Sequence, residues 1–153
     1  MPRYSPPVTG GLHDLGACLG YGWTLAANER LGMSTKDTYL AVFLSNKTSP
    51  SWRAWYAMSE EEQRAKGVVG LAALKAWDEK HRDSIVYEGG PLGPTKRTSP
   101  EGVADVVNEL TVFVVVRAPS HEEAAKLFEG HPHMTIFPCD AVDVMPLLSG
   151  PDA

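Results

Sequence analysis

Cysteine is scarce in this chain, and the motifs that cysteine forms in redox and zinc sites are missing. Only Cys18 and Cys139 occur among the 153 residues, and no CxxC pair is present. A disulfide between them would tie the N-terminal segment to the end of the main domain. Two free thiols in a reducing compartment is the simpler interpretation, so we expect a cytoplasmic protein.

Long apolar runs and clustered basic residues are also missing. No apolar run reaches the roughly 18 residues that a membrane-spanning helix needs. The partly apolar stretch 15–27 is interrupted by three glycines and is a poor signal peptide. The net charge is -5, and Lys96-Arg97 is the only adjacent basic pair. Nucleic acid and membrane partners are therefore not expected.

Residues 1–34 lack the periodicity of the rest of the chain. Prolines and glycines break every possible apolar face there, and Met33 stands just before a clean strand pattern. We expect an extension that is disordered or arises from a mis-called start, and a lid or interaction arm is the alternative. The predicted domain covers 35–148, and 149–153 form a tail.

From residue 38 onward the pattern alternates between strand and helix signals. Apolar, β-branched or alternating stretches predict four strands, and two Ser-Glu capping boxes begin the two main helices. The predicted strands cover 39–44, 84–88, 110–116 and 141–145, the predicted helices cover 59–80 and 120–128, a short helical turn covers 52–58, and 95–107 is predicted as a loop with a turn at 99–102.

The long helix carries a stripe at spacings of three and four. Its members are Gly67, Gly70, Leu71, Leu74, Trp77 and His81. We expect this face to lie close against a sheet because the two glycines permit close approach, while Asp78 and its charged neighbours are expected to point elsewhere.

The order of elements predicts an α+β fold of the ferredoxin-like βαββαβ type. Right-handed crossovers give a four-stranded antiparallel sheet with two helices on one face. Strand 110–116 is apolar on both sides, so the uncovered sheet face needs a partner. A homodimer through the open sheet face is the economical expectation.

Several motifs together resemble the YCII-like family, most closely its YCII-related branch. They are Glu88-Gly89-Gly90-Pro91-Leu92, the segment 120–125, HPHMTIFP at 131–138, VDVMP at 142–146 and NKTSP at 46–50. The resemblance covers residues 38–148 and implies a dimeric α/β barrel. The family's biochemistry is poorly defined. Gly70 replaces the histidine of the family's HLxxL pattern, and His131 replaces the aspartate of its DP pair.

The candidate site is a pocket at the helix–sheet interface. His131 and His133 flank a proline that favours extended geometry, so both imidazoles are expected on one face, where they would serve as tentative acid/base residues. Glu88, Gly89, Gly90 and Trp77 are the expected ligand-binding residues. The alternatives are structural histidines, a tight turn at Gly89-Gly90 and a core tryptophan. No metal motif is recognisable, and no cofactor is expected.

The sequence does not decide whether the protein is an enzyme. The leading hypothesis is a YCII-like domain that binds a small polar or anionic molecule in this pocket, with possible His-based acid/base chemistry. The alternative is a non-catalytic dimeric interaction or regulatory module.

Overall fold

The computed structural model describes residues 37–148. The predicted N-terminal extension, the tail and Cys18 lie outside these residues. The elements in chain order are β1 (Thr38–Leu44), α2 (Pro50–Tyr56), α3 (Glu60–Lys80), β2 (Ile85–Pro91), β3 (Thr95–Ser99), β4 (Gly102–Val106), β5 (Leu110–Arg117), α4 (His121–Lys126), α5 (Pro132–Thr135) and β6 (Ala141–Pro146).

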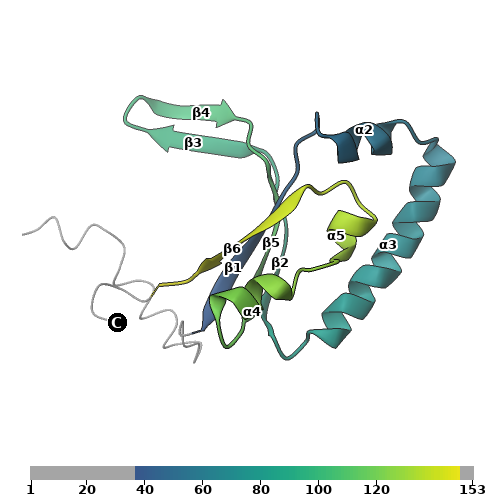
Figure 1. The fold of residues 1–153 in the computed structure, drawn as a ribbon. Helices are drawn as coiled ribbons and strands as arrows, with labels where there is room; N and C mark the ends of the chain where they lie inside the picture. The colour runs from purple at the N-terminus through teal and green to yellow at the C-terminus, as the bar shows by residue number, and fades with distance from the viewer. Residues whose placement is uncertain (1–36, 149–153) are drawn as a thin grey trace, which may run out of the picture. The chain divides into compact units, whose positions relative to one another are not determined.

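The main sheet has four strands in the order β2-β5-β1-β6 (Figure 1), and every pair is antiparallel. Strands β1 and β5, the most apolar in sequence, are the two central ones. This is the ferredoxin-like order, so the predicted four-stranded antiparallel α+β fold is confirmed.

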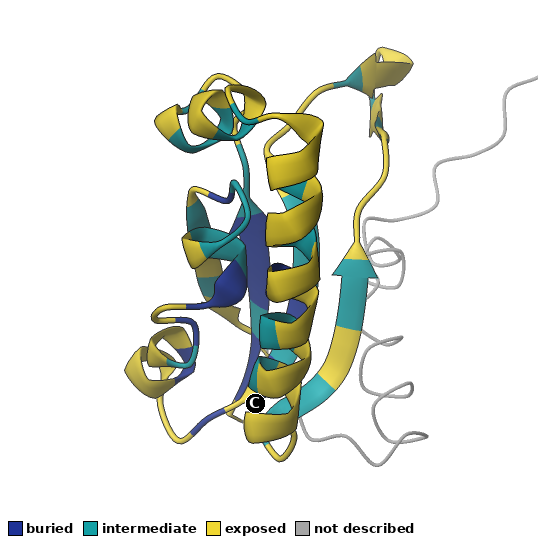
Figure 2. Ribbon diagram, turned by 90° about the vertical axis from the view of Figure 1, so that its right-hand side faces the viewer, coloured by how far each residue is buried: buried dark blue, intermediate teal, exposed yellow. Residues whose placement is uncertain are grey.

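The hydrophobic core lies between the sheet and the helices. One side of β1 and β5 supplies Tyr39, Ala41, Phe43, Val114 and Val116, and the helical side supplies Ala124, Phe128 and Trp77. The helices α3, α4 and α5 all cover this same face of the sheet (Figure 2). The opposite face carries no helix from the described part of the chain.

Both predicted helix starts are present, although only one is a complete capping box. The Ser59 side chain accepts from the Glu62 amide and the Glu62 carboxylate accepts from the Ser59 amide, which satisfies two donors at the start of α3. At α4 the Ser120 hydroxyl accepts from the Glu123 amide. The predicted C-terminal glycine, Gly130, has the expected left-handed φ of 67°.

Three predictions about local structure are wrong. The predicted loop at 95–107 contains the antiparallel hairpin β3–β4, which projects from the main sheet (Figure 1). Strand β3 is polar and both strands have only five residues, so the hairpin lacks the apolar alternation by which a strand is recognised in a sequence. Leu71 is not on the packed face of α3, because its side chain is 66% exposed. The segment after His131 is not extended, because α5 begins at Pro132.

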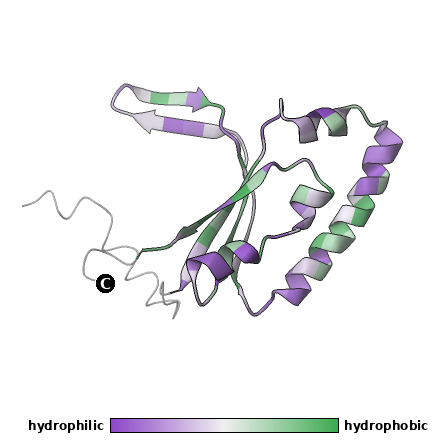
Figure 3. Ribbon diagram, in the orientation of Figure 1, coloured by the Kyte–Doolittle hydropathy of each residue, from purple (hydrophilic) through white to green (hydrophobic). Residues whose placement is uncertain are grey.

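The middle of α3 is rich in apolar residues, which are green in Figure 3. Val68, Val69 and Leu71 are all exposed, and Gly70 is the only fully buried residue of the helix. No helix within residues 37–148 is long and apolar enough to cross a membrane.

Candidate functional site

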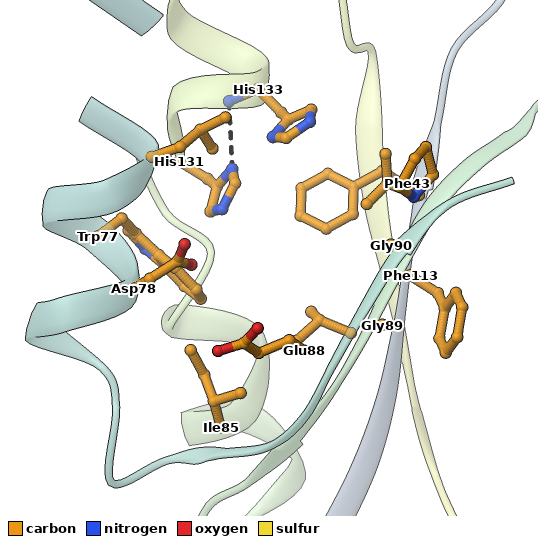
Figure 4. Close-up of a pocket in the computed structure, with 14 residues that line it drawn as sticks. Phe43, Trp77, Asp78, Ile85, Glu88, Gly89, Gly90, Phe113, His131 and His133 are labelled. Atoms are coloured by element: carbon orange, nitrogen blue, oxygen red, sulfur yellow. Dashed lines mark hydrogen bonds between the residues drawn. The ribbon is translucent and has the colours of Figure 1, made fainter. Parts of the chain in front are cut away.

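A pocket of about 330 Å³ lies between α3, the sheet and the start of α5. It brings together all six side chains or backbone positions expected from the sequence: Trp77, Glu88, Gly89, Gly90, His131 and His133. Its apolar walls come from Phe43, Leu74, Ile85, Val112 and Val114. The site is therefore assembled from five separate elements and the loop before α5 (Figure 4).

His131 occupies the N-cap of α5 and forms the inner wall of the pocket. Its side chain is 3% exposed, and its Nδ1 accepts a hydrogen bond of 3.2 Å from the His133 amide. An Nδ1 that accepts this bond carries no proton, so the neutral ring has its proton on Nε2. No residue of the described chain accepts from Nε2, and the ring points toward the pocket (Figure 4).

Burial keeps both imidazoles neutral. Burial, together with the nearby His133 and His81, lowers the pKa of His131 from 6.5 to about 3, and burial also lowers the pKa of His133. At neutral pH, a group with such a low pKa is protonated in only about one molecule in ten thousand. In this neutral form the His131 ring can donate a hydrogen bond from Nε2.

Aromatic packing fixes the positions of the two imidazoles. The His131 ring meets Trp77 edge to face with centroids 4.5 Å apart, and lies 4.8 Å from the Phe43 ring. His133 lies 4.9 Å from Phe43 and stacks on His131 at 5.2 Å. The Trp77 indole donates to the Leu127 carbonyl at 3.2 Å, which holds the indole in place. The inner end of the pocket is therefore rigid.

Two carboxylates face the histidines across the pocket. Asp78 projects from α3 and Glu88 from β2 (Figure 4). The pKa of Asp78 is raised, first by burial and then by the Glu88 carboxylate, while His81 acts weakly in the opposite direction. Asp78 was expected to point away from the packed face. Its spacing of four from Leu74, itself four from Gly70, was the signal that places it on the pocket side.

The glycine pair after Glu88 has a structural role in the pairing of β2 with β5. Gly89 has a φ of 62°, and a Cβ there would overlap the Phe113 carbonyl oxygen. The pairing of β2 with β5 shifts register between Tyr87 and Gly90, the interval that contains Gly89. Gly89 therefore permits a bulge with close strand–strand contact between β2 and β5. Gly90 has open space beside it.

No lysine or arginine lines the pocket. Lys96 of the adjacent basic pair Lys96-Arg97 lies on the hairpin and forms an ion pair of 2.6 Å with Asp105. The described residues contain no group of three or more His, Cys, Asp or Glu side chains that could hold a metal ion.

No protein-family model matches the sequence, and no curated protein sequence matches it. Among solved structures, the chain is similar to 5-chloro-2-hydroxyhydroquinone dehydrochlorinase from Burkholderia phenoliruptrix AC1100, in complex with 2,5-dihydroxybenzoquinone. The TM-score is 0.43 and the identity is 20%, over 72% of this chain and 93% of that chain. A likeness at this level carries no inference about ligand or reaction.

Proposed function

We propose that this chain is a YCII-like domain that binds a small polar molecule in the pocket between α3 and the sheet. The observation that carries the proposal is the buried His131 ring, which directs an unpartnered Nε2–H toward a pocket with apolar walls. Small-molecule sites in general combine such walls with a few convergent polar groups. His133 also lines the pocket, and its buried Nδ1 has no hydrogen-bond partner among the described residues. An unpaired buried polar atom is costly, and a polar group of a ligand would satisfy it.

The pocket favours a polar ligand over an anionic one, although both were expected from the sequence. Its only charged side chains are the carboxylates of Asp78 and Glu88, and these repel an anion. The negative wall and the donor wall face each other, so a ligand with an acceptor at one end would fit between them.

Chemistry in this pocket would use the histidines in their neutral form. A neutral imidazole can stabilise developing negative charge on an oxygen through its N–H, as neutral histidines do in other enzymes. Proton transfer would be carried out by Asp78, because its pKa is raised and lies closer to neutral pH than the pKa of an ordinary aspartate. This assignment replaces the expected acid/base role of His131.

A fragment screen followed by NMR tests the proposal, with two matched variants. Leu74 lines the pocket, whereas Leu71 lies on the exposed side of the same helix. We expect fragments to shift the Trp77 indole resonance of the wild type and of Leu71→Phe. The Leu74→Phe side chain fills the pocket, so the fragments should bind this variant at least tenfold more weakly than the wild type and cause correspondingly smaller shifts. Fragments that bind elsewhere, or equally well to Leu74→Phe, would contradict the proposal.

The alternative is a non-catalytic interaction module, and one observation favours it. Val68, Val69 and Leu71 form an exposed apolar surface on α3 that the fold does not use. An empty fragment screen, together with loss of self-association in Val69→Glu, would favour this alternative.

A further inference from the structure

The pocket carries two carboxylates and no lysine or arginine. Asp78 and Glu88 both face it, and neither forms an ion pair with any described residue. Lys75 and Arg82 line a neighbouring hollow that shares the two carboxylates, but they lie outside the pocket itself. Burial raises the pKa of Asp78, the neighbouring Glu88 carboxylate raises it further, and His81 acts in the opposite direction.

The pocket thus has a polarity from one end to the other. Carboxylates stand on one side, the rings of Phe43 and Trp77 form the middle, and the His131 Nε2–H lies at the inner end (Figure 4). The two imidazoles are neutral, so they add no positive charge to offset the carboxylates. A metal ion is a poor occupant, because the described residues offer no set of three ligands.

We propose that the pocket selects a small organic ammonium compound with an apolar or aromatic body. The ammonium would lie beside Asp78 and Glu88, and the body would pack between Phe43 and Trp77. This inference rests on the proposed function and names the ligand class of the same site. A cation removes the repulsion between the two carboxylates, and the aromatic walls add cation–π attraction.

Charge is the property that separates this ligand class from its neighbours. Phenethylamine, phenethyl alcohol and hydrocinnamate share a phenyl ring and differ in charge. Their binding to the purified chain can be compared by NMR titration at pH 7 in low salt, where surface charge is least screened. We expect the amine to bind at least tenfold more tightly than the alcohol, and the carboxylate to bind most weakly.

Three variants assign the effect to the pocket. Asp78→Asn and Glu88→Gln should each weaken amine binding about fivefold to tenfold and leave alcohol binding unchanged. Glu79→Gln is the matched control, because Glu79 follows Asp78 on α3 but lines only the neighbouring hollow. It should change amine binding less than twofold. An unaltered amide spectrum in each variant shows that the fold is retained.

The outcomes distinguish this inference from the proposed function. If the alcohol or hydrocinnamate binds as tightly as the amine, the pocket exists but the ammonium preference is overturned. An equal loss of amine binding in Glu79→Gln also overturns it, because the effect would then be general to the charge of the helix. If no probe or fragment binds in the pocket, both the inference and the proposed function are wrong.

Discussion

His131 combines burial and hydrogen bonding in a way that makes the fold sensitive to acid. In the unfolded chain its pKa returns to about 6.5, whereas in the fold it is held near 3. Below pH 6.5 His131 is therefore protonated in the unfolded state but stays neutral in the folded state. Stability from this residue is fully present above pH 6.5 and is lost as the pH falls toward 3.

Replacing His131 by Asn should reduce this acid sensitivity. Asn is a favourable N-cap and can accept from the amide that His131 now caps, but it does not titrate. The free energy of unfolding, measured by urea titration, should fall between pH 6 and 4 in both proteins. In the wild type it should fall by up to about 1.4 kcal/mol per pH unit more than in His131→Asn. The two proteins should have parallel profiles above pH 7. Equal slopes below pH 6 would show that His131 is not the group responsible.

At the residue scale, the sequence indicated which side chains meet but not what they do. The HPH motif, Glu88-Gly89-Gly90 and Trp77 line one pocket in the structure, and their roles in binding or catalysis stay predictions. The neutral state of His131 depends on burial by Trp77, Phe43 and Phe128, which are distant in sequence. Asp78 was assigned to the wrong side because it stands at the border of the stripe, where one helical step decides the face.

The helix α3 shows the different uses of glycine at the scale of an element. Gly67 has open space around the position of a Cβ, whereas a Cβ on Gly70 would overlap the Phe137 ring. Phe137 in turn packs near Trp55 and His133, with centroid distances of 6.1 and 5.7 Å. Gly70 thus brings α3 close to the segment that carries both histidines.

Alanine at these two positions should have opposite effects. Gly67→Ala should stabilise the protein by about 0.5–1 kcal/mol, because alanine is the better helix former. Gly70→Ala gains the same amount but displaces Phe137, at a cost of about 1–3 kcal/mol, so it should be destabilising overall. The midpoint of urea unfolding measures both changes in stability, provided that m, the dependence of the unfolding free energy on urea concentration, is unchanged. A stabilising Gly70→Ala would show that the Phe137 ring moves without cost.

Elements were predictable where local chemistry agreed with tertiary packing. The Ser59 capping box and the apolar strands β1 and β5 could be read directly, because their signals are local and strong. The hairpin β3–β4 was missed because it pairs only with itself and buries no apolar face. The helix α5 was missed because Pro132 favours both extended structure and the first position of a helix.

The open face of the main sheet is the outstanding feature at the scale of the whole molecule. The Phe113 ring lies on the opposite side of the strands from His131 (Figure 4), and it contacts Tyr87 with centroids 5.9 Å apart. Tyr87 and Met145 are both exposed. The strand order was predictable from the order of elements, but a sequence does not state what covers such a face.

We propose that a second copy of the chain covers it, and Phe113→Glu tests this. Light scattering should give twice the mass of one chain for the wild type, and the dissociation constant should rise at least tenfold in Phe113→Glu. Val103→Glu is the control, because Val103 is an apolar residue on the hairpin, away from the main sheet, and is 68% exposed, whereas Phe113 is half-buried. A wild type that stays monomeric at high concentration, or equal effects of the two variants, would exclude this interface.

The projecting hairpin has a consequence for the practical handling of the molecule. The chain leaves β2 at Leu92, whose amide already bonds to Thr111 of the neighbouring strand at 2.7 Å, and it returns at Leu110. The base is closed by a 2.9 Å bond between Asn108 and Thr95. Lengthening the tip at Pro100-Glu101 therefore leaves the sheet register untouched. That turn is a natural graft point for a fluorescent reporter or surface tether that would leave the pocket free.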